Sequence, residues 1–290
     1  MPDSTPRPRG PRPSRPQQGR LAPRQDKVRP EDPTIAKILT LANEVMKALG
    51  PGLPTTFYRQ LFTTRLQQSG LTLQLKPRGV LKHREQAAAV FTPDFLCETS
   101  VVLDLHEGTA DLSQAQIAAT ASAQKFFNAA HGLVLHFARN EVLHRHLHQS
   151  NGAFPTIPHE EIMRGHTVEK HDDLRATMLC RALLRVGRSH GLGFCQATYR
   201  GLLRAEFTAE SLDFSDEPTA AIVVDGTSLG ECPMSQIMTV QRSGALLVLA
   251  QQDGIHAADK QRLAAACRYL QMPWGLIAHF GRRRFEWQWL

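Results

Sequence analysis

Two stretches of this 290-residue chain repeat each other in order, and this limits the fold more than any other feature of the sequence. The segment GPGLPTTFYRQL (50–61) matches GLGFCQATYRGL (191–202), and both contain the spacing G-x-G-x5-Y-R. Further along each half, GLVLHFA (132–138) matches GLIAHFG (275–281). The two matches lie at nearly the same separation in the chain. This predicts a tandem duplication.

Each half is expected to have the order helix, helix, strands, helix, strands. In the first half, Asp32-Pro33 resembles a helix start, and apolar residues then keep a helical period until Gly50. The expected strands of this half are 71–75, 79–82, 88–97, 101–106, 132–138 and 141–148, with a helix over 112–130. The predicted division is an N-terminal arm, a first domain, a linker and a second domain, at 1–31, 32–148, 149–171 and 172–290.

Two acidic residues stand in apolar surroundings in the segment FTPDFLCETSVVLDLHE (91–107). Asp94 follows Pro93, and Asp104 lies between leucines, where an unpaired acid is costly. A hairpin with its turn near residues 98–100 would bring both carboxylates together, and alternation along the strand would place His106 on the face of Asp104. Such a pair can hold a divalent cation and a water molecule. The alternative is that both acids are ordinary polar residues at strand ends.

In the overlay of the two halves, the second half has no acid at the positions of Asp94 and Asp104. The overlay sets Gln236 opposite Asp94, Val248 opposite Asp104 and Ala250 opposite His106. Side chains of this kind cannot form a metal site, so the second half is expected to bind none.

The positive charge of the chain is concentrated at its N-terminus. The whole sequence carries a net charge of +7, and residues 1–30 hold eight Lys or Arg against two Asp. The composition predicts a disordered, Pro-rich arm that meets nucleic acid or another polyanion, or else a solubilising tail without a specific partner. The arginines of the predicted contact are Arg7, Arg9, Arg12, Arg15, Arg20 and Arg24.

The ordered series of motifs resembles the GxxExxY family of the PD-(D/E)XK nuclease-like superfamily. The motifs are the corner GPGL-x3-FY with Gly52 and Tyr58, the strand with Asp94, the strand LDLH, the pair Ala115-Gln116 and the closing LVLHF. Gly193 and Tyr199 repeat the corner in the second half. Thr55 and Gln196 stand where the family has its name-giving glutamate, and His106 stands where it has a lysine.

The resemblance implies an α/β (α+β) fold of two tandem restriction-endonuclease-like domains, each a mixed central sheet flanked by helices. It also implies catalytic positions at Asp94, Asp104, His106 and Gln116, with Mg²⁺ or Mn²⁺ held by Asp94 and Asp104 in the first domain alone. Because the helix acid and the lysine are missing, we expect a non-catalytic or weakly active protein that binds DNA or RNA. The alternatives are a Mg²⁺- or Mn²⁺-dependent nuclease working from the first domain, and a protein interaction module.

Other features of the sequence bear on location and metals. There is no apolar run of membrane-spanning length and no secretory signal, so we expect a cytoplasmic protein without a membrane partner. The resemblance further implies that the two domains pair with each other. His144, His146 and His148 alternate on one expected strand, which puts three imidazoles on one face. That face either binds a transition metal or is the solvated side of an edge strand.

Overall fold

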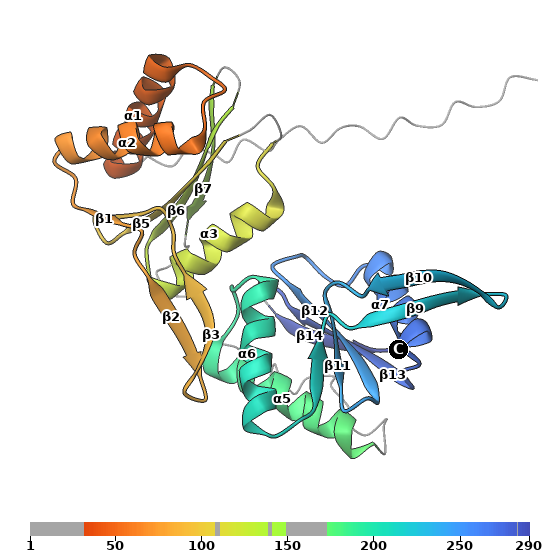
Figure 1. The fold of residues 1–290 in the computed structure, drawn as a ribbon. Coiled ribbons are helices and arrows are strands. Elements are labelled where there is room, and N and C mark those ends of the chain that lie inside the picture. Colours follow the sequence, from red (N-terminus) through yellow and green to blue (C-terminus); the bar gives the residue numbers. More distant parts are fainter. Residues whose placement is uncertain (1–31, 108–110, 139–140, 149–172, 283) are drawn as a thin grey trace, which may run out of the picture.

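The computed structural model of the chain describes residues 32–107, 111–138, 141–148, 173–282 and 284–290. It contains two units with the same order of elements, here called the first unit (32–148) and the second unit (173–290) (Figure 1). The arm and the linker expected from the sequence lie outside the described residues. Within those residues, no helix has the length and apolar character that crossing a membrane requires.

The first unit is a five-stranded mixed sheet with helices on both faces. The sheet order is β1-β4-β5-β6-β7, in which only β5 and β6 are parallel. Strands β2 and β3 form a separate hairpin. The elements are α1 (Pro33–Leu49), α2 (Thr55–Gln68), β1 (Leu73–Leu75), β2 (Gly79–His83), β3 (Gln86–Phe91), β4 (Phe95–Cys97), β5 (Val101–Glu107), α3 (Gln114–Phe126), β6 (His131–Phe137) and β7 (Val142–His148).

The second unit repeats this arrangement, with sheet order β8-β11-β12-β13-β14 and β12 and β13 as its parallel pair. Its separate hairpin is β9–β10. The elements are α5 (Leu174–His190), α6 (Gln196–Ala209), β8 (Phe214–Asp216), β9 (Thr219–Val224), β10 (Thr227–Pro233), β11 (Ile237–Val240), β12 (Gly244–Ala250), α7 (Ala257–Leu270), β13 (Trp274–Phe280) and β14 (Phe285–Trp289). The expected fold class, two mixed sheets flanked by helices, is confirmed.

Most expected elements of the first unit are present, with one clear difference. The strand predicted over 88–97 is two strands, β3 and β4, which belong to different sheets. Pro93 lies between them and has no N–H to continue a ladder, so the pairing is interrupted there and β3 turns away with β2. The expected hairpin turn at residues 98–100 is confirmed, because the Ser100 amide donates to the carbonyl of Cys97 at 3.0 Å.

The repeated corner is built identically in both units. The hydroxyl of Tyr58 donates to the carbonyl of Gly50 at 2.7 Å, and that of Tyr199 donates to the carbonyl of Gly191 at 2.7 Å. The second glycine of each motif has a positive φ, 88° at Gly52 and 108° at Gly193, which a side chain would make unfavourable. The tyrosine rings stack on the phenylalanines of the closing strands, Phe137 and Phe280. The family-motif residues therefore join the start of each unit to its end.

The strand register corrects the overlay of the two halves by one residue. Asp104 pairs with Val134 on β6, whereas at the equivalent place of the second unit Leu247 pairs with Ile277 on β13. Side chains alternate between faces, so Val248 lies on the opposite face from the one that Asp104 would occupy. By the same register His106 corresponds to Leu249, not Ala250. Asp94 corresponds to Ile237, not Gln236, since their carbonyls accept from Lys76 and Glu217 at 2.9 Å at matching places.

The hairpin β2–β3 of the first unit packs on helix α6 of the second, as Figure 1 shows. The contact is a close backbone approach. A Cβ added to Gly201 on α6 would lie 1.9 Å from the carbonyl oxygen of Ala88 on β3. The equivalent position of the first unit on α2 is Gln60, which is exposed. One apolar core continues across this contact, joining Phe91 to residues of α5 and α6.

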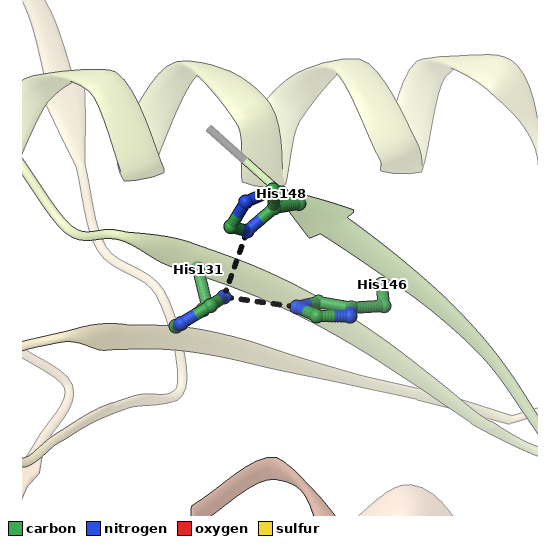
Figure 2. A group of neighbouring side chains, drawn as sticks. All are labelled: His131, His146 and His148. Atoms are coloured by element: carbon green, nitrogen blue, oxygen red, sulfur yellow. Dashed lines mark hydrogen bonds between the residues drawn. The ribbon is translucent and has the colours of Figure 1, made fainter. Parts of the chain in front are cut away.

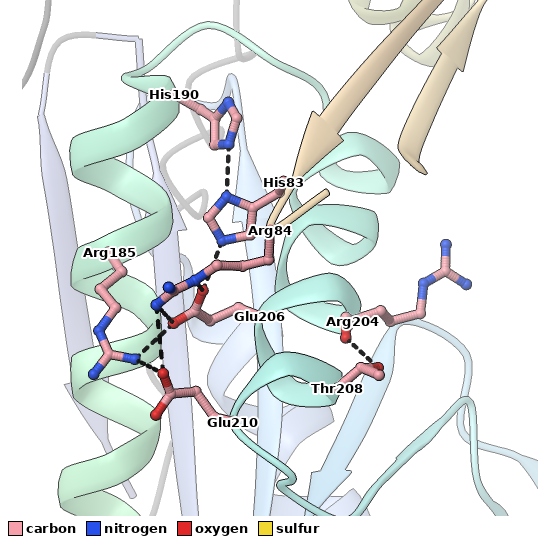
Figure 3. A network of polar contacts seen from close by, with 8 residues as sticks. All are labelled: His83, Arg84, Arg185, His190, Arg204, Glu206, Thr208 and Glu210. Carbon is pink, nitrogen blue, oxygen red and sulfur yellow. Dashed lines mark hydrogen bonds and ion pairs between the residues drawn. The ribbon is translucent and has the colours of Figure 1, made fainter. Parts of the chain in front are cut away.

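A buried acid on α6 fixes the tip of the same hairpin. The side chain of Glu206 is fully buried and accepts hydrogen bonds from Arg84 Nε at 3.0 Å and Arg185 at 2.8 Å, and it lies 2.7 Å from His83 Nε2 (Figure 3). Burial by itself raises the pKa of Glu206, but the hydrogen bonds from Arg84, Arg185 and His83 outweigh it and lower the pKa to about 2. This network ties the two units together by charge.

Helix α3 of the first unit holds the corner of the second. Lys125 donates to the last carbonyls around the end of α5, at His190 and Leu192, and lies over the ring of Phe194 at 4.2 Å. Burial lowers the pKa of this lysine to about 8. The hydroxyl of Ser122 accepts from the amide of Cys195 at 2.7 Å. These contacts and the hairpin β2–β3 join the two units.

Candidate functional site

The two acids of the first unit meet where β4 and β5 begin to diverge. Asp94 stands immediately before β4, and Asp104 lies within β5. The amide of Asp94 donates to Asp104 Oδ1 at 3.1 Å, and the amide of Leu105 donates to Asp94 Oδ2 at 2.9 Å. Each carboxylate therefore accepts a hydrogen bond from the backbone of the other strand. The structure brings together the two acids that the sequence singled out.

Asp94 is paired with an arginine that sequence reasoning did not assign to the site. Arg59 on α2 donates from its NH2 group to Asp94 Oδ2 at 3.1 Å, and its Nε lies 2.9 Å from Oδ1 without the alignment of a hydrogen bond. Both side chains are mostly buried. The guanidinium neutralises the carboxylate. A signal was present in the sequence, because a Tyr-Arg pair closes the corner motif in both halves.

Asp104 is held from the opposite side by helix α3. The hydroxyl of Thr120 donates to Asp104 Oδ2 at 2.6 Å. Burial raises the pKa of Asp104, and the hydrogen bonds from Thr120 and from the Asp94 amide offset this only in part. The carboxyl group therefore keeps its proton to a higher pH than an exposed aspartate does. Thr120, which is fully buried, is a further site residue that the sequence analysis missed.

His106 lies beside Asp104, as the alternation along β5 predicted. Both line one pocket between β3, β5 and α3, together with Pro93, Phe91 and Gln116. Burial lowers the pKa of His106, although Asp104 and Asp94 act in the opposite direction. The imidazole is accordingly neutral at pH 7. It therefore brings no positive charge to this pocket.

Gln116 has its side-chain oxygen committed to the start of α3. Gln116 Oε1 accepts from the amide and from the hydroxyl of Ser113, both at 2.8 Å, which forms a capping box. The residue also borders the pocket. Its contacts are those of a helix cap. A catalytic role for Gln116 stays a prediction.

The acids do not fit a divalent cation as they are arranged. Mg²⁺ and Mn²⁺ are held by several oxygen ligands, usually carboxylates that face one space. Asp104 lines the pocket, whereas Asp94 does not and is turned to Arg59. A divalent ion shared by both carboxylates would therefore lie close to a guanidinium group, and the two cations would repel each other.

The second unit has an apolar core at the same place. Ile237, Leu247 and Leu249 replace Asp94, Asp104 and His106, and all three are buried against α7. Leu263 stands where the first unit has Thr120, because α7 follows the same register from its cap. Arg200, the equivalent of Arg59, pairs instead with Asp216 and with Glu217. At these three positions the second unit has no side chain that could ligate a metal ion.

Part of the predicted site lies outside the described residues. This part consists of the six arginines of the arm, from Arg7 to Arg24. Their contact with nucleic acid stays a prediction.

Comparison with known proteins supports the superfamily part of the resemblance for the first unit. Residues 32–147 match the family model described as the PD-(D/E)XK nuclease superfamily. The matched residues span α1 to β7 and contain the whole pocket described above. No curated protein matches the chain.

Proposed function

We propose that this protein uses a nuclease fold to bind nucleic acid and not to cut it. The observation that carries the proposal is the ion pair between Arg59 and Asp94. In a metal-dependent nuclease, carboxylates hold a cation that polarises the phosphate and activates water, and a second cationic group stabilises the developing charge. In this chain the guanidinium of Arg59 pairs with the carboxylate of Asp94, and the imidazole of His106, beside Asp104, is neutral at pH 7.

The binding part of the proposal rests on charge. Residues 1–30 carry most of the +7 net charge, and the remaining 260 residues are close to neutral. A run of arginines attracts phosphates without reading sequence, by releasing counterions. In this proposal the arm contacts the phosphates of the nucleic acid by charge, and a face of the first unit makes a further contact with it.

We further propose that the two units arose by tandem duplication within the GxxExxY branch, with domains near 32–148 and 172–290. The shared strand order and the identical corners support this. In this proposal the second unit is the architectural partner, and α6 is the surface that receives the hairpin of the first.

The arm is tested in the full chain by exchanging charge without changing length. Replacing Arg7, Arg9, Arg12, Arg15, Arg20 and Arg24 by Gln should lower affinity for labelled DNA and RNA at least tenfold at low salt. The plot of log affinity against log salt concentration should also become shallower, with a slope smaller by roughly 0.7 to 0.9 for each lost phosphate contact. The same six positions changed to Lys are the control and should bind nearly as the wild type does. Equal binding by the Gln variant would contradict the arm's role.

The metal is tested by calorimetry with Mg²⁺ and Mn²⁺. We expect no measurable binding at the pair of acids in the wild type, and a gain when Arg59→Gln releases Asp94. Arg65→Gln, on the exposed side of the same helix, should change nothing.

Cleavage of DNA or RNA by the wild type with these metals, abolished by Asp104→Ala, would replace the proposal with the alternative of an active nuclease. Purification with bound protein and without nucleic acid would favour an interaction module.

A further inference from the structure

Three histidines of the first unit gather on two neighbouring strands, away from the pocket of Asp104. His131 begins β6 and is directly opposite His148 on β7, and His146 lies two residues before His148 on the same face (Figure 2). The odd-numbered residues of β6 pack against α1 and α2, whereas Asp104 faces α3. The histidines therefore lie on the other face of the sheet from the acids.

The ring nitrogens are spaced as ligands of one metal ion. His131 Nδ1 lies 3.0 Å from His146 Nε2 and 3.5 Å from His148 Nδ1. One such atom from each of the three rings lies within 4.8 Å of the others. Zinc binds imidazole nitrogens at about 2.0–2.1 Å in a tetrahedron, which sets the nitrogens about 3.3 Å apart. The two shorter separations lie on either side of this value.

A carboxylate orients the central ring. Asp32 Oδ2 lies 3.4 Å from Nε2 of His131, the nitrogen not used toward the other rings. Asp32 Oδ1 accepts from the amide of Thr34 and so caps α1. A carboxylate on the far nitrogen of a histidine ligand fixes the ring and strengthens it as a ligand.

The second unit keeps this frame with rings that cannot bind metal. Asp173 caps α5 through the amide of Arg175, as Asp32 caps α1, and its second oxygen accepts from Trp274 Nε1 at 2.9 Å. Trp274 occupies the place of His131, and Trp289 that of His146, with the two indole rings in edge contact. An indole N–H donates but has no lone pair for a metal. The contact between the capping aspartate and the ring at this position therefore forms with either histidine or tryptophan.

We propose that His131, His146 and His148 bind a transition metal ion of the zinc class, with one coordination position left for water or a further ligand. Three imidazoles suit Zn²⁺, Co²⁺, Ni²⁺ or Cu²⁺ and do not suit Mg²⁺. Through Asp32 the bound ion would hold the start of α1, and hence the base of the arm, against the edge of the sheet. The sequence pointed to His144, His146 and His148. The structure instead joins His131 to the last two, because His144 is opposite Leu135.

The test is titration of the untagged, metal-free full chain with Co²⁺, followed by displacement with Zn²⁺. We expect one ion per chain, the visible absorption of tetrahedral cobalt, and affinity that falls on acidification, because a protonated imidazole cannot bind the metal. His131→Trp introduces the residue of the second unit, which can keep the Asp32 contact. It should lower affinity at least 100-fold with little change in melting temperature.

Two further variants separate this site from chance binding by exposed imidazoles. His144→Ala, on the same strand, should leave affinity unchanged. Asp32→Asn retains a cap for α1 and should lower affinity about tenfold. The proposal is overturned if the wild type shows no tetrahedral cobalt spectrum, if His131→Trp binds as the wild type does, or if His144→Ala loses as much affinity as His131→Trp.

Discussion

The two units share their backbone plan and differ in what their equivalent positions carry. Where the first unit has Asp94, Asp104 and Thr120, the second has Ile237, Leu247 and Leu263, all in its apolar core. The second unit shows that this fold does not need the polar side chains. Buried acids cost free energy, so their presence in the first unit is better explained by a role than by stability.

The units also differ in how they use their hairpins. The hairpin β2–β3 of the first unit is packed on α6, whereas β9–β10 of the second is largely exposed, with Leu229 68% and Val223 52% accessible. The pairing is therefore one-directional. Four predictions, from the largest expected effect to the smallest, test these two differences.

Leu247→Asp, which copies Asp104 into the second unit, should have the largest effect. Leu247 is fully buried, and an unpaired carboxylate there should lower the free energy of unfolding by about 4 kcal/mol. Adding Leu263→Thr supplies the hydroxyl that Thr120 gives to Asp104, and should restore about 1.5 kcal/mol. Urea unfolding followed by circular dichroism measures both. A tolerated Leu247→Asp would mean that acids at this position are not costly.

Gly201→Ala should weaken the contact between the units. The added Cβ would meet the Ala88 carbonyl at 1.9 Å, and we expect a loss of about 3 kcal/mol from the backbone shift that follows. Gln60→Ala, at the equivalent exposed position on α2, should change stability by less than about 0.5 kcal/mol. If the two variants unfold alike in a thermal melt, the hairpin contact does not depend on this glycine.

Glu206→Gln should cost about 2 kcal/mol, because Arg84, Arg185 and His83 lose a buried charged partner. Glu210→Gln, on the same helix and partly exposed, should cost under about 0.5 kcal/mol. Since the folded-state pKa of Glu206 is lowered to about 2, its contribution is present above the unfolded value of 4.5 and is lost as the pH falls from there toward 2.

His190, whose pKa is lowered to about 4 by burial and by His83, adds a loss that begins higher, between pH 6.5 and 4. Stability measured from pH 7 to 3 should fall in both ranges for the wild type. The Glu206→Gln variant should fall mainly in the upper one. If the variant lost as much stability as the wild type below pH 4.5, acid would be acting on groups other than Glu206 and its partners.

Tyr58→Phe and Tyr199→Phe should have small and equal effects, about 1 kcal/mol each, because both hydroxyls donate to a corner carbonyl at the same distance. The third tyrosine, Tyr269, is half-buried on α7, and Tyr269→Phe is the control. Melting temperatures at matched protein concentration compare the three. Clearly unequal effects at 58 and 199 would show that the two corners are not equivalent.

The sequence predicted what local pattern determines. The helix starting after Asp32, the hairpin turn at residues 98–100 and the shared side of Asp104 and His106 all follow from caps, turn position and strand alternation. The break at Pro93 was missed although Thr92, Pro93 and Asp94 interrupt the apolar run and a proline inside a strand pattern is itself a signal for a break.

Contacts between distant residues were beyond the local pattern. Arg59 meets Asp94 only once α2 lies over the sheet, and His131 faces His148 only in a particular register of β6 and β7. The one-residue error in the overlay has the same origin. A shift of one position leaves the apolar pattern of a fully buried strand unchanged and reverses the face of every side chain.

Gly201, which lets the hairpin β2–β3 approach α6, also distinguishes α6 from α2 as a docking surface. A head-to-tail contact, in which one surface of a molecule meets a different surface of the next, can continue from molecule to molecule into an open filament. Here the exposed hairpin β9–β10 would need a receiving helix like α6 on the first unit of the next molecule, and α2 presents Gln60 where that helix has a glycine. The close backbone approach that Gly201 gives to β2–β3 is therefore not available to β9–β10 on α2.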